Sequence, residues 1–194
     1  MKKVFLLLLI FPLLQLACDQ NEYKCDSSRF FNITGLELIP AFSDENYFAQ
    51  TLKDLDSARF ERFYLGGQLK AEYYSLIEKQ PFSIFPKAYA RDVDPCPISG
   101  YEGSEEKLAG LYLIALGKYN ATIQPGDTLK TNYRINNQSP SEYLSQNSQK
   151  ITSQQLTITL TEKPDPKEYQ SFKLIYKLTN GETYELITPK IKLL

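Results

Sequence analysis

Apolar and polar residues alternate through the last quarter of this 194-residue chain, and this alternation constrains the fold more than any other feature. Residues 156–161 alternate strictly, and residues 172–178 and 183–188 repeat the pattern on either side of Asn180-Gly181. Because successive side chains of a strand face opposite sides of a sheet, the pattern predicts strands with one buried face. Asn-Gly between two such runs predicts a tight hairpin, since that turn requires positive φ angles.

Further strands are predicted along the rest of the chain. They cover residues 30–39, 60–65, 68–77, 82–85, 87–90, 109–116 with an extension over 119–123, 129–135 and 191–194. Gly66-Gly67 is predicted to form a turn or a bulge, and residues 125–127 (Pro-Gly-Asp) a turn. The odd-numbered residues from Leu129 to Ile135 are expected to share one strand face.

Two short helical segments are predicted between the strands. Apolar residues recur at helical spacing within residues 45–55. Residues 139–145 lie in a polar stretch where Ser139 or Ser141 would cap a helical turn. Residues 91–106 are rich in proline, glycine and acidic residues, and are predicted to form a loop.

The predicted fold is all-β. Many short strands with turn signals roughly every ten residues are typical of an antiparallel β-sandwich. We expect an immunoglobulin-like arrangement with one or two short helical turns, and a closed barrel is the alternative. Residues 29–194 have the length of one ordinary domain and contain neither an internal repeat nor a second boundary.

Residues 1–17 have the pattern of a secretory signal peptide. Two lysines precede an apolar run over residues 4–14, and the small Ala17 precedes the expected cut. The apolar run is shorter than the roughly 20 residues that span a bilayer, and Pro12 interrupts it. We therefore expect cleavage between Ala17 and Cys18, and an uncleaved membrane anchor is the weaker alternative.

The cysteine at the cut makes this signal resemble that of bacterial lipoproteins, which end in Leu-(Ala/Ser/Thr)-(Gly/Ala)-Cys. Ala17 and Cys18 match this pattern, whereas Gln15 and Leu16 depart from it. The resemblance implies that Cys18 becomes the first mature residue, with diacylglycerol on its sulfur and usually a further acyl chain on its amine. Each buried methylene adds roughly 0.8 kcal/mol of membrane affinity, so two or three chains anchor stably. An ordinary cleaved signal with a chance cysteine is the alternative.

Residues 18–28 are expected to form a solvated tether, because four polar residues, 19–22, follow the cysteine directly. The acidic residues soon after Cys18 resemble those of Bacteroidetes surface lipoproteins. This resemblance implies that the protein is anchored in the outer membrane and faces outward. In enterobacterial lipoproteins, an aspartate directly after the cysteine implies retention in the inner membrane. The inner membrane therefore stays an alternative.

With Cys18 lipidated, Cys25 and Cys96 are left as a pair. An exported chain folds in an oxidising compartment, where a disulfide between them is expected. Closing a loop of about 70 residues would stabilise the fold by roughly 4 kcal/mol in the chain-entropy model. Two free thiols are the alternative, and a metal site is a weaker one, because two thiolates fall short of a zinc ligand set.

Charge and composition exclude several classes of function. The formal net charge of −1 becomes −3 when the two lysines of the signal are removed, and no basic block indicates a nucleic-acid partner. The chain has no histidine, which excludes Ser-His and Cys-His catalysis, histidine metal ligands and a histidine pH switch. It also has no tryptophan, a favoured platform for sugar rings.

No residue pattern defines a catalytic, cofactor or metal site. Asp92, Asp94 and the glutamates of 102–106 are close in sequence, but their spacing lacks the calcium-loop pattern, so we expect a solvated acidic loop. The scattered carboxylates do not single out the pair that a glycosidase needs. No serine stands in a Gly-x-Ser-x-Gly elbow.

Tyrosines are the candidate residues of a binding surface, because they give rigid amphipathic contacts. The competing interpretation is that a tyrosine in an alternating strand belongs to the core, with its hydroxyl reaching the edge. The candidates are Tyr73, Tyr74, Tyr89, Tyr101, Tyr112 and Tyr119.

Two triplets, Asp56-Ser57-Ala58 and Asp127-Thr128-Leu129, resemble the Asp-(Ser/Thr)-apolar sequences that Bacteroidetes O-glycosylate after export. The resemblance implies O-glycosylation at Ser57 and Thr128. The expectation depends on the export signal of residues 1–17, because this modification follows export.

The chain as a whole resembles a family of small Bacteroidetes lipoproteins with no assigned activity. The shared features are the lipid signal, a cysteine soon after it, a first strand like residues 30–36 (Phe-Phe-Asn-Ile-Thr-Gly-Leu) and a β-rich C-terminal half. We expect a lipid-anchored, non-catalytic envelope protein that binds a glycan or a protein and needs no cofactor. The alternatives are an assembly accessory that pairs through an exposed edge at 191–194, and a carboxylate-dependent hydrolase.

Overall fold

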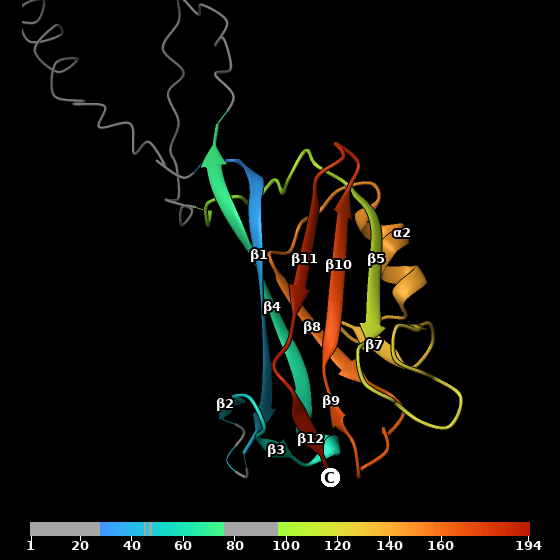
Figure 1. Cartoon of the computed structure of the whole chain (residues 1–194). Helices are drawn as coiled ribbons and strands as arrows, with labels where there is room; N and C mark the ends of the chain where they lie inside the picture. The colour runs from blue at the N-terminus through green and yellow to red at the C-terminus, as the bar shows by residue number, and fades with distance from the viewer. Residues whose placement is uncertain (1–27, 45, 47, 76–96) are drawn as a thin grey trace, which may run out of the picture.

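The structure is a computed structural model, and it describes residues 28–44, 46, 48–75 and 97–194 (Figure 1). In chain order the elements are β1 (Phe30–Ser43), β2 (Ala49–Thr51), β3 (Ser57–Ala58), the 3-10 turn η1 (Phe60–Arg62), β4 (Phe63–Tyr74), β5 (Leu108–Ala115), β6 (Thr128–Leu129), β7 (Tyr133–Ile135), α2 (Pro140–Asn147), β8 (Gln155–Leu160), β9 (Tyr169–Gln170), β10 (Phe172–Leu178), β11 (Thr183–Ile187) and β12 (Ile191–Leu193). The strands predicted over 82–85 and 87–90 lie outside the described residues.

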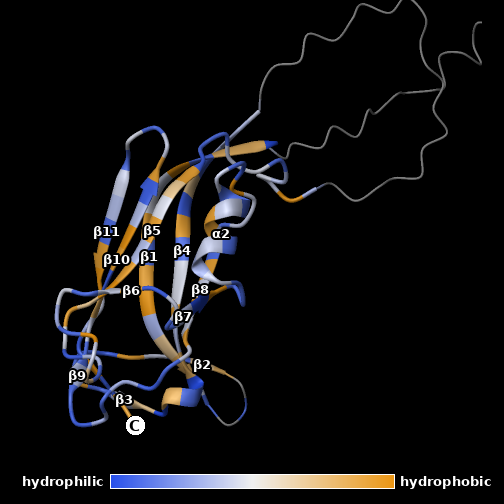
Figure 2. Cartoon of the chain, turned by 90° about the vertical axis from the view of Figure 1, so that its right-hand side faces the viewer, coloured by the Kyte–Doolittle hydropathy of each residue, from blue (hydrophilic) through white to orange (hydrophobic). Residues whose placement is uncertain are grey.

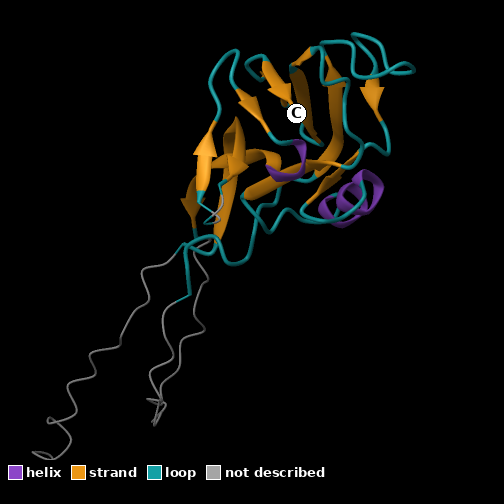
Figure 3. Ribbon diagram, turned by 90° about the horizontal axis from the view of Figure 1, so that it is seen from below, coloured by secondary structure: helices purple, strands orange, loops and turns teal. Residues whose placement is uncertain are grey.

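The strands form two antiparallel sheets and a third, small sheet. The first sheet has the order β2-β1-β4-β8-β7, the second β11-β10-β5-β6, and the third β3-β12-β9. In immunoglobulin notation, β1-β4-β8-β7 is the order A-B-E-D and β11-β10-β5-β6 is the order G-F-C-C′. Figure 3 shows the strands in layers with α2 outside them. The prediction of an antiparallel sandwich is confirmed, and the sheets do not close into the barrel that was its alternative.

The alternation of residue types in the sequence becomes an alternation of burial. In β10, the residues at alternate positions from Phe172 to Leu178 are buried. Lys173, between them, pairs with Glu185 of β11 on the outer face, with Nζ and Oε2 2.6 Å apart. Figure 2 shows the same alternation of apolar and polar residues along the strands. Burial of one face of each sheet makes the core between them.

Two turns predicted from glycine, at Gly181 and Gly126, are confirmed, although Asn180 does not share the positive φ of Gly181. Gly181 has φ +97° in the β10–β11 hairpin, and Gly126 has φ +94° in the turn that leads into β6. Both angles lie in the left-handed region that glycine enters without a steric cost. The position of a connection between two strands is therefore most predictable from the sequence where the connection is a tight turn with glycine.

The helix predicted over residues 45–55 is wrong. The Asp44 carboxylate accepts hydrogen bonds from the backbone N–H groups of Asn46 and Phe48, at 2.8 and 2.9 Å, and closes a turn. The chain then returns along β1 as β2. Of the expected apolar face, Leu52 is buried whereas Phe48 is exposed. A local side-chain bond and pairing with β1 replace the helix here.

Gly66-Gly67 forms neither a turn nor a bulge. β4 runs straight through both glycines, and the first residues predicted as strand before it form η1. A Cβ atom on Gly67 would lie 2.9 Å from Leu156 Cδ2, so glycine lets β8 pack closely against β4. The register shift in the pairing of β1 with β4 lies instead in β1, between Ile33 and Gly35.

Two predicted strands of the middle region are also wrong. Residues 119–123 do not extend β5, because the Asn120 side chain accepts hydrogen bonds from the backbone two and three positions later, at 2.9 and 2.8 Å. Residues 129–135 do not form one strand. β6 belongs to the second sheet and β7 to the first, so the chain crosses between the sheets and Thr131 is exposed.

The last predicted strand is confirmed as β12, but it offers no free edge. β12 is the middle strand of the third sheet, with β3 parallel on one side and β9 antiparallel on the other. Ile191 and Leu193 are buried. The expectation that residues 191–194 pair with a partner through an exposed edge is therefore wrong.

Candidate functional site

A hollow of about 690 Å³ opens on one flank of the sandwich, where β6, β7 and the start of α2 meet β5. β6 pairs with β5 only at Leu113 and Ile114. The helix α2 packs beside β5 and β7. The space between the end of β6 and the start of α2 is therefore left open along the edge of β5.

The sheet crossing builds one wall of this hollow. Leu129 and Tyr133 are buried on either side of the crossing and fix it to the core. Lys130 and Thr131 between them are exposed and line the hollow. Burial raises the pKa of the Tyr133 phenol to about 12, against a smaller opposite effect of a hydrogen bond from the Leu113 backbone. Tyr133 is therefore a neutral, structural part of the wall at physiological pH.

The start of α2 forms the second wall and is closed by a capping box. The Ser139 hydroxyl accepts a hydrogen bond from the Glu142 backbone N–H, and the Ser139 backbone N–H donates to the Glu142 carboxylate at 2.8 Å. The hydrogen bond from the Ser139 side chain, followed by that from its backbone, lowers the pKa of the Glu142 carboxyl. The predicted Ser139 cap is confirmed, and it satisfies backbone donors that would otherwise attract an anion.

Tyr112 of β5 gives the hollow an exposed aromatic ring. Its side chain is 43% exposed, and the Lys177 ammonium lies 5.6 Å from the ring centroid on the outer face. Lys130 and Arg134 add cations, and Thr131 and Ser139 add hydroxyl groups. Among the described residues, those that line the hollow include no aspartate or glutamate. The hollow therefore offers stacking, hydroxyl and cationic contacts, but no carboxylate pair for acid–base hydrolysis.

A second group of exposed aromatic residues gathers where the chain enters the sandwich. This entry end comprises residues 28–31, 73–75 and 97–104. The Gly100 backbone N–H donates to the Ser28 carbonyl at 2.7 Å, and the Phe31 N–H to the Gly103 carbonyl at 3.2 Å. Gly100 packs so closely that a Cβ atom there would lie 2.9 Å from the Tyr73 ring. These contacts fix the 97–104 loop to the ends of β1 and β4.

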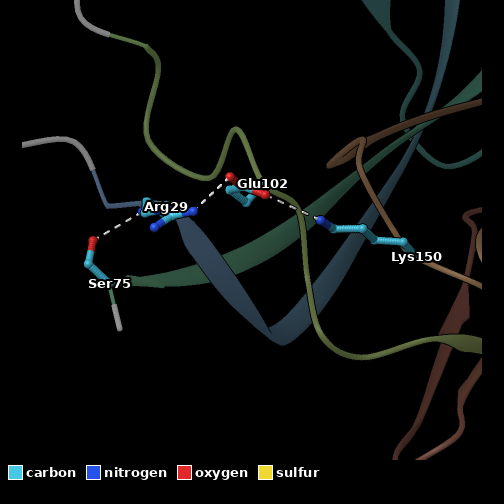
Figure 4. A network of polar contacts seen from close by, with 4 residues as sticks. All are labelled: Arg29, Ser75, Glu102 and Lys150. Carbon is cyan, nitrogen blue, oxygen red and sulfur yellow. Dashed lines mark hydrogen bonds and ion pairs between the residues drawn. The ribbon is translucent and has the colours of Figure 1, made fainter. Parts of the chain in front are cut away.

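Ion pairs reinforce the entry end (Figure 4). The Glu102 carboxylate lies between two cations, 3.1 Å from the Arg29 Nη2 and 3.7 Å from the Lys150 Nζ. The Arg29 backbone N–H donates to the Ser75 hydroxyl at 3.1 Å, so β1 is also joined to the end of β4. Arg29 and Lys150 both lie within 6 Å of the Phe30 ring centroid. Sequence reasoning missed this network, because its members are far apart along the chain and share no local pattern.

The candidate tyrosines divide between these two places and the core. Tyr73 and Tyr101 are exposed at the entry end, and Tyr112 is exposed in the hollow. Tyr119 is fully buried, and its hydroxyl donates to the Glu162 carbonyl. Burial, and secondarily the Glu162 charge, raises the pKa of Tyr119. Of the others, Tyr74 stacks on Phe30, and Tyr89 lies outside the described residues.

The two O-glycosylation triplets have the same local structure. Asp56 and Asp127 each accept a hydrogen bond at 2.7 Å from a backbone N–H three residues earlier, which closes a turn. Ser57 and Thr128 follow as exposed first residues of short strands. The third residue of each triplet is buried. Both hydroxyl groups are therefore accessible, and Thr128 also lines the hollow.

The three cysteines lie outside the described residues, so the lipid on Cys18 and the Cys25–Cys96 bond stay predictions. Their described neighbours are nonetheless joined, because Ser28 and Gly100 share a backbone hydrogen bond. Cys25 is three residues from Ser28 and Cys96 four from Gly100. The number of residues on each side is therefore compatible with the predicted bond.

The described glutamates of the acidic loop have structural partners. The Glu106 carboxylate accepts hydrogen bonds from the Ile33 backbone N–H at 2.6 Å and from the Asn180 side chain at 3.1 Å. Glu102 holds the ion pairs described above. Asp92 and Asp94 lie outside the described residues. Within the described ranges, no three metal-ligating side chains gather at one point.

Comparisons with known proteins return no match. No family model fits the sequence, and neither a curated protein nor a solved structure is significantly similar to it. In the part of the chain that the structure describes, no helix has the length and apolar character to cross a membrane.

Proposed function

We propose that this chain is a lipid-anchored protein of the bacterial cell envelope whose flank hollow binds a carbohydrate without catalysis. The observation that carries the proposal is the Tyr112 ring, exposed in a hollow that is also lined by hydroxyl groups and cations. A rigid ring beside polar groups suits a sugar, whose faces are apolar and whose rim is hydroxylated. Lys130 and Arg134 favour a sugar that carries acidic groups.

The proposed location depends on the first eighteen residues. Cleavage between Ala17 and Cys18 would leave Cys18 lipidated in the outer membrane, with the sandwich on its outer face. A disulfide between Cys25 and Cys96 would then join the tether to the entry end. Exposed Ser57 and Thr128 would be accessible to an O-glycosylating enzyme after export.

Binding is tested with the full mature chain carrying Cys18→Ser, which stays in solution. An array of neutral and acidic bacterial oligosaccharides is screened, and each hit is measured by calorimetry. We expect Tyr112→Ala to weaken binding by roughly 30-fold, because truncating an aromatic hot spot costs about 2 kcal/mol.

Tyr169→Ala is the matched control. Tyr169 is also 43% exposed and also lies under a lysine, with Lys192 Nζ 6.0 Å from its ring centroid, but it belongs to the third sheet. Its loss should leave the affinity unchanged. An array with no reproducible hit, or equal effects of the two substitutions, would contradict the proposed carbohydrate site.

A further inference from the structure

The place where the chain enters the sandwich decides which surface a lipid anchor holds near the membrane. Ten residue steps separate Cys18 from Ser28, and they reach at most about 35 Å. β1 starts at the entry end and runs the length of the sandwich as 14 residues, about 46 Å. The entry end is therefore always within tether reach of the bilayer. The opposite end is within reach only when the sandwich tilts well away from upright, because the sandwich is longer than the tether.

Exposed apolar side chains gather at the entry end. Ile98 is 87% exposed, Tyr101 49% and Tyr73 43%. The loop that bears Ile98 and Tyr101 is held by backbone hydrogen bonds to Ser28 and Arg29, at 2.7 and 2.8 Å. These side chains are therefore presented on a fixed loop, and burying them costs little additional backbone ordering.

The chemistry of this surface suits the interface of a bilayer. Tyrosine is enriched at the headgroup level, where its ring meets the acyl boundary and its hydroxyl meets water. Arg29 and Lys150 lie around the aromatic residues, but Glu102 pairs with both. Glu102 offsets one of these two positive charges, so only one is left in excess among them, and contact should depend mainly on apolar insertion and little on anionic lipids.

We propose that the entry end is a membrane-docking surface, and that Ile98, Tyr101 and Tyr73 insert into the headgroup region of the bilayer that holds the lipid on Cys18. The inference rests on the lipid anchor of the proposed function. It adds an orientation, because the third sheet at the other end then points away from the membrane. The hollow on the flank then stays open to solvent.

The absence of tryptophan from the chain makes this orientation measurable. The full lipidated protein carrying Tyr101→Trp is reconstituted into phosphatidylcholine vesicles with or without bromine on the acyl chains. We expect bromine to lower the emission of this indole roughly twofold or more, since interfacial side chains lie at the acyl boundary. Ile98→Trp is the second reporter. Phe48→Trp, exposed in the β1–β2 turn at the opposite end, is the control and should not be quenched.

Flotation of the vesicles separates the two proposals. Protein that does not float has no lipid anchor, which overturns both the proposed anchor and this inference. Protein that floats while both entry-end reporters are unquenched, or are quenched no more than Phe48→Trp, overturns the docking surface alone. Quenching that requires phosphatidylglycerol in the vesicles would contradict the apolar mode of contact.

Discussion

The entry end and the flank hollow both expose tyrosine, but the two regions hold it in different ways. At the entry end, Tyr101 projects from a loop fixed by backbone hydrogen bonds and ion pairs, and Tyr73 projects from the adjoining end of β4. In the hollow, Tyr112 lies on a strand beside a sheet crossing and a capped helix. A projecting group of side chains suits a flat surface such as a bilayer, whereas a hollow suits a ligand that enters it. The placement of a tyrosine, more than its exposure, therefore distinguishes the two proposed roles.

Alkali should have the largest effect, and it should act on the core and on the wall of the hollow. Tyr133 is buried there, Tyr119 and Tyr176 are buried in the core, and burial raises the pKa of all three. Below pH 10 both states keep these protons. Above pH 10 the unfolded state loses them while the folded state keeps them, so the free energy of unfolding falls as pH rises toward the folded-state pKa, about 12 for Tyr133.

This loss is measured as the urea midpoint at a series of pH values, followed by circular dichroism. Tyr133→Phe should reduce the dependence on pH above 10, even though it lowers stability at neutral pH. A midpoint that stays constant to pH 12 would contradict the burial of these phenols.

Gly103→Ala should break the entry end. Gly103 has φ +83°, and a Cβ atom there would lie 2.7 Å from the Ile151 carbonyl oxygen. We expect a loss of about 2–4 kcal/mol, the sum of a left-handed conformation and an overpacked contact. Gly126→Ala, beside the hollow, is the matched control. Its φ is +94° with open space around it, so only about 1–2 kcal/mol should be lost. Equal losses in urea unfolding would show that the close packing at Gly103 is absent.

Ser139→Ala should loosen the wall of the hollow. Loss of an N-cap costs about 1 kcal/mol of stability. Because the pKa of Glu142 is lowered by Ser139, this carboxylate stabilises the fold at neutral pH, and the stabilisation is lost as pH falls through its folded-state pKa. The variant should therefore lose less stability on acidification than the parent. Identical acid titrations of the two proteins would rule out the capping box.

Glu102→Gln should have the smallest effect. The ion pairs with Arg29 and Lys150 are partly exposed, so their loss should cost less than about 1 kcal/mol, and high salt should remove the difference. Glu37→Gln, which breaks a more exposed pair with Lys70, is the control and should cost no more. A large loss that salt does not change would mean that Glu102 acts through packing instead of charge.

The fold was predictable wherever strand alternation and turn chemistry agree. The hairpin of β10 and β11 is an example. The alternation of residue types, the glycine at the turn and the burial of one strand face all specify the same structure there. Prediction failed at the connections. The Asp44 and Asn120 side chains accept hydrogen bonds from backbone N–H groups two to four residues later. The apolar residues that follow them have the periods of a helix or a strand without forming either.

The candidate sites were less predictable than the fold. The hollow exists because residues 129–135 leave one sheet and join the other. The alternation of apolar and polar residues continues through this segment, so the sequence does not reveal the change of sheet. The entry end depends on contacts such as Arg29 with Glu102, which are 73 residues apart. The tyrosines were identifiable as candidates, but only the fold separates exposed Tyr112 from buried Tyr119.

The intact mass of the mature protein, purified from the membranes of a bacterial host, tests the lipid anchor most directly. We expect a chain that begins at Cys18, with the added mass of diacylglycerol and an acyl chain, and two hydrogens fewer for the Cys25–Cys96 bond. Cys18→Ser should abolish the added mass and release the protein from the membrane. A mature chain that begins at another residue, or that carries an unmodified Cys18, would contradict the proposed anchor.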